Sequence, residues 1–229
     1  MIVAMLGFAI EDSLIRLISL TIPFGQVLFL FGLGGALIFA FFCKVQKQQL
    51  FVKEVLSSPM IIRMLFELIG RLFYSLSLVL MPISLVTLVL QATPIFVVAG
   101  AAIIFRESVG VFRWIAIFSG LLGVILIIKP ASDGFSPYVL FAVLGMLGFA
   151  GRDLGSRAAS PKLSYHHLGF YGFVAVMSAG IIFSVWANTT YVSCNIQTLI
   201  YIISVSYTHL RAHETASYLV CRLQLEKKT

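Results

Sequence analysis

Charged residues are scarce in this protein: Asp, Glu, Lys and Arg make up 11% of its 229 residues, against about 25% in an ordinary soluble domain. Cysteine is scarce as well. The three cysteines (Cys43, Cys194 and Cys221) are too far apart to form a metal-binding or redox pair. The low charge excludes a disordered chain, a nucleic-acid-binding domain and an ordinary cytosolic enzyme. The cysteine pattern argues against a disulfide scaffold, and we expect no metal and no cofactor.

Signature motifs of enzymes and of ATP-driven pumps are also absent. The sequence contains no HExxH, no GxSxG and no GxxxxGK[ST] nucleotide loop. We therefore expect neither a membrane-embedded enzyme nor an ATPase.

Apolar residues dominate the chain, at 60% with a mean hydropathy of +1.03. A helix needs about 20 apolar residues to cross a bilayer. The sequence therefore predicts an all-α fold, a polytopic bundle of transmembrane helices. The predicted spans are 2–20, 24–42, 60–80, 84–104, 112–129, 138–157, 167–187 and an eighth from about 196.

Basic residues are unevenly distributed between the predicted loops. Loops after odd-numbered spans, up to residue 195, contain only Lys129. Loops after even-numbered spans contain seven basic residues: Lys44, Lys47, Lys53, Arg106, Arg113, Arg157 and Lys162. Because basic loops stay on the cytoplasmic side, this asymmetry predicts a cytoplasmic N-terminus.

An internal repeat joins the two halves of the chain. Residues 5–16 read MLGFAIEDSLIR and residues 146–157 read MLGFAGRDLGSR, so Asp12 matches Asp153 and an arginine follows each by four positions. Five spans precede the second copy, and an odd number reverses its direction through the membrane. Inverted repeats are typical of secondary transporters, whose substrate site lies between the halves.

The densest set of motifs lies in residues 81–130. In order, they are Met81-Pro82, Pro94-Ile95-Phe96, Glu107, Trp114, Gly120 with Gly123, and Lys129-Pro130. In this order and spacing they resemble the EamA-type transporters of the drug/metabolite transporter superfamily. The resemblance runs from about residue 2 to 203. It implies ten helices in two inverted five-helix repeats, and movement of small metabolites across a bacterial inner membrane.

Mapped onto this pattern, residues 1–130 form the first repeat and residues 138–204 begin a second, incomplete repeat, so that seven to eight of ten helices are present. Residues 205–229 depart from the pattern. Their segments SYTHLRAHET and LVCRLQLEKK resemble translated sequencing-adapter read-through, and the alternative is a cytoplasmic amphipathic tail. We expect the tail to be non-native and assign it no role.

Polar residues inside the predicted spans are the candidates for a substrate or coupling cavity, because intramembrane charges are costly and usually face the bundle interior. Arg63, Glu67 and Arg71 follow one another at four-residue steps, which places them on one helix face. Arg63 is expected near the cytoplasmic mouth. The cavity candidates are Glu11, Asp12, Arg16, Glu67, Arg71, Tyr74, Gln91 and Asp153. The alternative for the charged ones is a structural ion pair that fixes helix packing.

Other polar and small residues have simpler interpretations. Pro94 predicts a helix kink, because it leaves the carbonyl near Leu90 without its helical donor. His166 and His167, at the start of the seventh span, are interpreted as interfacial polar residues. The glycines of the segments 32–35 and 120–123 are expected to be close-packing surfaces between helices.

The sequence as a whole predicts a secondary transporter of small polar or zwitterionic metabolites that works by alternating access. A guanidinium paired to a carboxylate, with N–H donors to spare, suits an anionic or zwitterionic substrate. The expected partners are the lipid bilayer and a small-molecule substrate, with no nucleic acid and with a homodimer left open. The alternative is a fragment with no transport activity as written.

Overall fold

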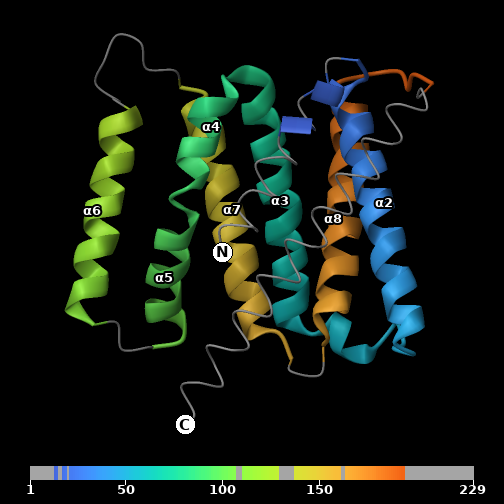
Figure 1. Ribbon diagram of the computed structural model, residues 1–229, viewed down its shortest axis with the longest axis horizontal. Coiled ribbons are helices and arrows are strands. Elements are labelled where there is room, and N and C mark those ends of the chain that lie inside the picture. Colours follow the sequence, from blue (N-terminus) through green and yellow to red (C-terminus); the bar gives the residue numbers. More distant parts are fainter. Residues whose placement is uncertain are drawn as a thin grey trace. The chain divides into compact units, whose positions relative to one another are not determined.

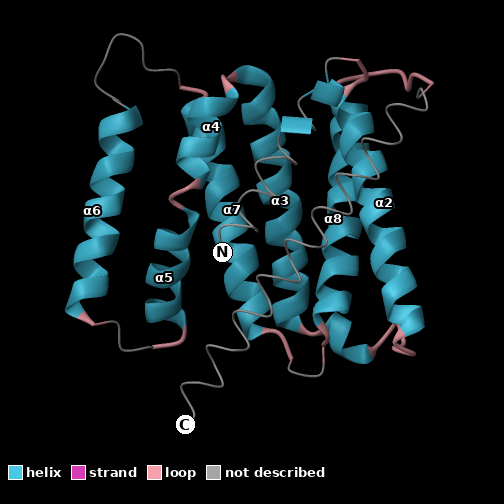
Figure 2. Cartoon of the chain, in the orientation of Figure 1, coloured by secondary structure: helices cyan, strands magenta, loops and turns pink. Residues whose placement is uncertain are grey.

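Helices are the only regular secondary structure in the residues that the computed structural model describes (Figures 1 and 2). Those residues are 13–14, 17–19, 21–106, 110–128, 137–160 and 163–193. The elements are α2 (Phe24–Val45), the 3-10 turn η1 (Lys53–Leu56), α3 (Ser58–Leu80), α4 (Ile83–Leu90), α5 (Thr93–Ile104), α6 (Val111–Ile128), α7 (Val139–Ala158) and α8 (Tyr165–Trp186).

Proline and serine mark where several helices begin. Pro23 and Pro82 are the N-cap residues of α2 and α4, and a proline also lies in the first turn of α3. Proline fits these positions because the first helical N–H groups have no partner within the helix. At α8 the N-cap is Ser164, whose side chain accepts a hydrogen bond from the N–H of His166.

Four helical stretches are long and apolar enough to cross a membrane: Phe24–Val45, Ile83–Ile104, Val139–Ala158 and His166–Trp186. They coincide with predicted spans, which confirms a polytopic helical protein. At 23 residues α3 is as long as these stretches, but it carries three charged residues, Arg63, Glu67 and Arg71. α3 therefore differs from the four stretches by its charged residues and not by its length.

The predicted span 84–104 is interrupted. α4 ends at Leu90 and α5 begins at Thr93, with Gln91 and Ala92 between them. Pro94 has no N–H to give the carbonyl of Leu90, and the Thr93 hydroxyl donates to that oxygen instead, at 2.5 Å. The broken helix thus keeps this backbone oxygen bonded, as a segment at membrane depth requires.

The chain divides into two compact units. The α2–α8 unit comprises residues 1–52 and 161–229, and the α3–α7 unit comprises residues 53–160. Each unit pairs a helix from the first predicted repeat with a helix from the second. The two repeats themselves remain a prediction from the sequence.

In the α2–α8 unit, glycines let α2 and α8 approach in antiparallel directions. A Cβ atom on Gly32 would lie 2.5 Å from the backbone nitrogen of Met177, and one on Gly180 would lie 2.5 Å from that of Phe29. Gly35 faces the ring of Phe173 in the same way. The expectation that the glycines of the segment 32–35 pack closely is confirmed for Gly32 and Gly35.

Aromatic rings fill the rest of this contact, and both histidines of α8 are buried in it. The ring of His166 stacks on Phe42 with centroids 6.1 Å apart. His167 Nε2 lies 2.8 Å from the carbonyl oxygen of Gln49, and the Tyr171 hydroxyl donates to the carbonyl of Leu50 at 3.2 Å. His166 therefore packs on α2, and His167 faces the segment that follows α2. Their interpretation as interfacial polar residues stays a prediction.

In the α3–α7 unit, α3 and α7 are also antiparallel and touch through glycine. A Cβ atom on Gly148 would lie 2.4 Å from Cα of Gly70, and one on Gly155 would lie 2.9 Å from Cβ of Arg63. Such contacts bring the two backbones together. Because the backbones are close, polar side chains of α3 and α7 can contact one another directly.

The helix α6 presents a largely apolar exposed surface. A Cβ atom on Gly120 would lie 2.6 Å from the side chain of Ile95, whereas one on Gly123 would have no atom of the described residues within 4 Å. Close packing is therefore seen at Gly120, and at Gly123 it stays a prediction. The large exposed apolar residues of α6 are Val111, Phe112, Ile115, Phe118, Leu122 and Leu126.

These glycine contacts predict opposite effects of the same substitution at two positions. Gly148→Ala forces a methyl group onto the Gly70 backbone and should cost about 1–3 kcal/mol of stability. Gly123→Ala, the matched control, meets no neighbour among the described residues and should be neutral or stabilising, since alanine favours helix over glycine by about 1 kcal/mol. Thermal unfolding of the detergent-solubilised proteins measures both. Equal melting temperatures for the two variants would contradict the close α3–α7 contact.

Candidate functional site

A stripe of buried polar side chains runs along α3. Arg63, Glu67, Arg71 and Tyr74 are between 3% and 6% exposed. Their spacing of three to four residues places them on one face of the helix, and that face packs on α7. Charges at such depth are tolerated when they pair with one another.

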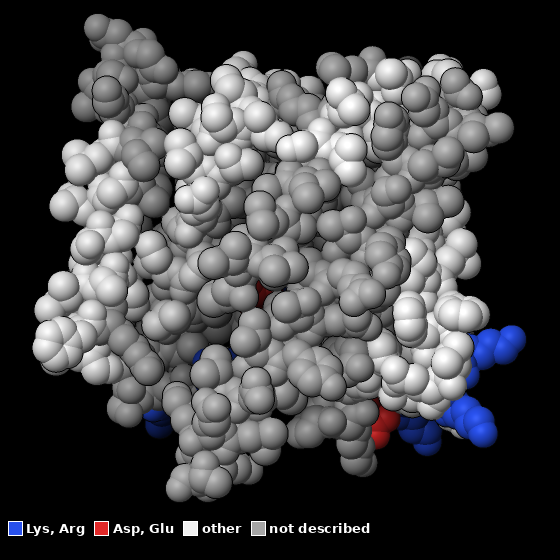
Figure 3. Space-filling model, viewed as in Figure 1, with Lys and Arg blue, Asp and Glu red and all other residues white. Residues whose placement is uncertain are grey.

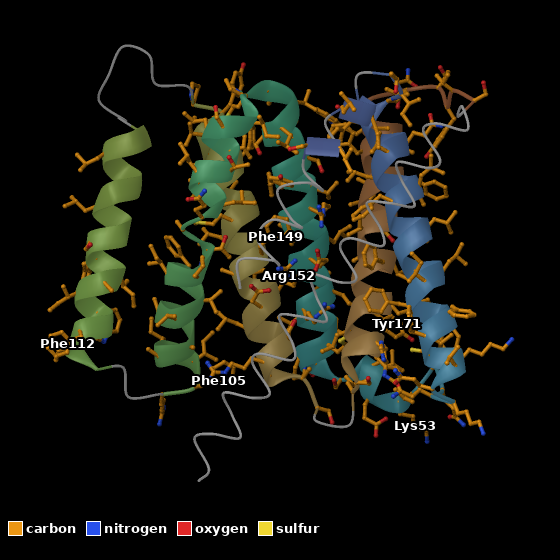
Figure 4. All side chains as sticks on the ribbon, in the orientation of Figure 1. Lys53, Phe105, Phe112, Phe149, Arg152 and Tyr171 are labelled. Atoms are coloured by element: carbon orange, nitrogen blue, oxygen red, sulfur yellow. The ribbon has the colours of Figure 1, made fainter. Side chains whose placement is uncertain are left out.

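α7 supplies the matching charges from Arg152, which Figure 4 labels beside Phe149, and from Asp153. Arg152 Nη1 lies 3.5 Å from Glu67 Oε2, so this pair joins the two helices. Arg152 Nη2 and Nε lie 2.8 Å and 2.9 Å from Asp153 Oδ1. The guanidinium of Arg152 is therefore held by two carboxylates, one from each helix.

The aromatic ring of Phe149 lies beside two of these arginines. The guanidinium carbon of Arg152 is 5.1 Å from the ring centroid, and that of Arg71 is 5.5 Å from it. Both distances fall within the range of cation–π attraction. Glu67 lies between the same two arginines, with Oε1 4.0 Å from Arg71 Nη2. One ring and one carboxylate thus hold both guanidinium groups.

Arg63 completes the cluster near the first turns of α3. Its Nε donates to Ser156 Oγ at 2.7 Å, and Ser156 Oγ donates to the carbonyl of Arg152 at 2.9 Å. Two buried N–H positions have no hydrogen-bond partner among the described residues: Arg63 Nη1 and Arg71 Nε. Unpaired buried donors on charged groups are costly, and they mark where an additional acceptor would be favourable.

The sequence-predicted residues fall into three groups. Glu67, Arg71, Tyr74 and Asp153 come together between α3 and α7, and the Asp153 side chain is 41% exposed. Gln91 is exposed where α4 ends, and Pro94 is exposed in the first turn of α5. The remaining candidates, Glu11, Asp12 and Arg16, lie outside the described residues.

The sequence analysis listed Asp153 among the cavity candidates, but not Arg152, Phe149 or Ser156. These three residues lie three to four positions apart, so a helical face drawn from Arg152 would have found them. Phe149 gave no separate signal, because phenylalanine is common in apolar spans. Arg157, the expected partner of the repeat, is exposed and lies over the ring of Phe105 at 5.5 Å.

The cluster combines guanidinium groups, carboxylates and an aromatic ring. Among the described residues no group of three or more His, Cys, Asp or Glu side chains is arranged to hold a metal ion.

The Glu67–Arg152 pair predicts a measurable coupling. Arg152→Gln leaves Glu67 with less compensation and should lower stability by about 2 kcal/mol. In a double-mutant cycle, Glu67→Gln should cost less in the Arg152→Gln background than in the unsubstituted protein. Arg157→Gln, an exposed position on the same helix, is the control. Strictly additive melting shifts for Glu67→Gln and Arg152→Gln would argue against the pair.

Curated relatives of this chain are metabolite transporters by name. The chain is 26% identical over 128 residues to the S-adenosylmethionine uptake transporter of Rickettsia prowazekii, an alignment that covers 55% of this chain and 44% of that protein. The chain is 32% identical over 77 residues to the riboflavin transporter of Vibrio cholerae, an alignment that covers 34% of this chain and 24% of that protein. It is 23% identical over 191 residues to the pseudopaline exporter CntI of Pseudomonas aeruginosa, an alignment that covers 82% of this chain and 65% of that protein.

No solved structure matches the chain. The chain spans less than half the length of the S-adenosylmethionine uptake transporters that it matches. The model of the EamA-like transporter family matches residues 1–129, which is more than half of the chain. The match includes α3, with its buried charged stripe, and the apolar helices α2, α4 and α5. The chain therefore belongs to the EamA-like transporter family.

Proposed function

We propose that this protein moves small polar or zwitterionic metabolites across a bacterial inner membrane as a secondary transporter. The observation that carries the proposal is the buried ion cluster between α3 and α7, in a helical chain of a transporter family. A charge in an apolar span costs several kcal/mol, and a binding role gives a reason to keep five charged side chains there.

The mechanism that we propose is alternating access between two inverted repeats. Support comes from the internal match of residues 5–16 with 146–157 and from the antiparallel packing of α3 on α7. In such transporters one repeat rocks against the other around a fixed site. The glycine contact between α3 and α7 offers a smooth surface for small movements of that kind.

We also propose that the N-terminus lies in the cytoplasm. In the α2–α8 unit, the exposed Lys44 and Lys47 lie at the end where α2 finishes and α8 begins. Figure 3 shows Lys and Arg side chains, in blue, gathered at the lower right of the view. In the α3–α7 unit, the exposed Lys53 and Arg157 lie at the end where α3 begins and α7 finishes. Basic residues collect on the cytoplasmic side, so each unit supports the same direction.

Uptake by purified protein in liposomes tests the proposed function. Radiolabelled S-adenosylmethionine and riboflavin are suitable probes, because relatives carry these names. Glu67→Gln and Arg71→Ala should lower the initial uptake rate by about tenfold or more, the effect expected from loss of one charge-assisted hydrogen bond. Lys44→Gln, an exposed substitution in the other unit, should leave it unchanged. Normal uptake by Glu67→Gln and Arg71→Ala would remove these residues from the mechanism.

A further inference from the structure

The arginines of the α3–α7 cluster differ in how completely their donors are bonded. Arg152 uses Nε, Nη1 and Nη2 on the carboxylates of Asp153 and Glu67. Arg71 has an ion pair with Glu67 at 4.0 Å, which is too long for a hydrogen bond. Its Nε has no hydrogen-bond partner among the described residues. Arg71 is therefore a buried arginine with no hydrogen bond from its guanidinium among the described residues.

The contact of Arg71 with Phe149 does not use the N–H groups of the guanidinium as hydrogen-bond donors to an oxygen. A guanidinium that places its face on an aromatic ring keeps its in-plane N–H groups for oxygen acceptors. Arg71 is 6% exposed, so water supplies little compensation for the missing acceptor. Two N–H groups of one guanidinium match the two oxygens of a carboxylate.

The charges of the cluster point to an anion as well. Arg63, Arg71 and Arg152 bring three positive charges, and Glu67 and Asp153 bring two negative charges. The described residues of this cluster therefore carry one uncompensated positive charge. Glu11, Asp12 and Arg16 lie outside the described residues and are not included in this balance.

Position distinguishes Arg71 from Arg63, the other arginine with an unbonded donor. Arg63 lies in the second turn of α3 and is fixed through Nε to Ser156 at 2.7 Å. Arg71 lies near the middle of the 23-residue helix. A substrate site near the middle of the membrane is expected for a transporter with inverted repeats.

We infer that Arg71 binds an anionic oxygen group, a carboxylate or its equivalent, on the transported molecule, and that this group accepts a hydrogen bond from Arg71 Nε. The inference rests on the proposed function. It assigns Arg152 to holding Glu67 and Asp153 in place, and leaves Arg71 as the residue that recognises the anion.

A pair of probes that differ only in the carboxylate tests this assignment. Uptake of S-adenosylmethionine, which has a carboxylate, is compared in liposomes with that of its decarboxylated derivative, and riboflavin serves as a probe without a carboxylate. The unsubstituted protein should prefer S-adenosylmethionine by about tenfold or more, the scale of one charge-assisted hydrogen bond. Arg71→Gln should bring the preference close to one, and Arg71→Lys should retain part of it.

Arg63→Gln is the matched control, because Arg63 is equally buried on the same face. It should change uptake of both probes alike and keep the preference. Gel filtration of each variant in detergent identifies misfolded protein, and Arg71→Lys preserves the test if Arg71→Gln does not fold.

Three results would overturn the inference. Equal uptake of the two matched probes, or uptake of riboflavin alone, would refute an anion site and leave the transport function standing. Loss of the preference in Arg63→Gln with its retention in Arg71→Gln would refute the assignment to Arg71. No uptake of any probe by the unsubstituted protein would refute the proposed function, and the inference with it.

Discussion

The cost of placing charge in apolar surroundings governs the α3–α7 unit. α3 carries Arg63, Glu67 and Arg71 on its buried face, and an isolated charge at this depth is unfavourable by several kcal/mol. Arg152 Nη1 reaches Glu67 at 3.5 Å only because α3 and α7 run close together. Gly70 and Gly148 create that approach, since any side chain at Gly148 would meet backbone. The glycine contact is thus a condition for the ion network, and the network in turn explains why a charged helix remains packed there.

Both units use glycine to bring two antiparallel helices together, but different side chains fill the two contacts. In the α2–α8 unit, glycines such as Gly32 and Gly180 also bring two antiparallel helices together, but aromatic rings fill the contact. Two polar side chains of α8 bond to the backbone: the buried His167 to the carbonyl oxygen of Gln49, and the half-buried Tyr171 to that of Leu50. The two units therefore share one helix-packing rule, in which small residues let the helices approach and larger neighbours fill the contact.

Much of the fold followed from the sequence because a bilayer leaves few options. Apolar runs of about 20 residues must form helices there, so the spans agree with α2, α7 and α8 to within a few residues. The stripe on α3 followed from helical periodicity. Which helix would face it did not follow, because hydropathy contains no information on pairing. The same limit affected His166, whose burial depends on Phe42 of another helix, and Gly123, which has no described neighbour at close range.

Phe149 shows why the site needed the structure. In the sequence it is one of twenty phenylalanines, and in the fold it contacts both Arg71 and Arg152. A ring in this position attracts cations without neutralising them, unlike a carboxylate. Phe149 lies beside Arg71 without accepting a hydrogen bond from it, and Arg71 Nε has no hydrogen-bond partner among the described residues. An aromatic residue among arginines is therefore compatible with the anion recognition that we infer, because the ring contacts the guanidinium and leaves its N–H groups to oxygen acceptors.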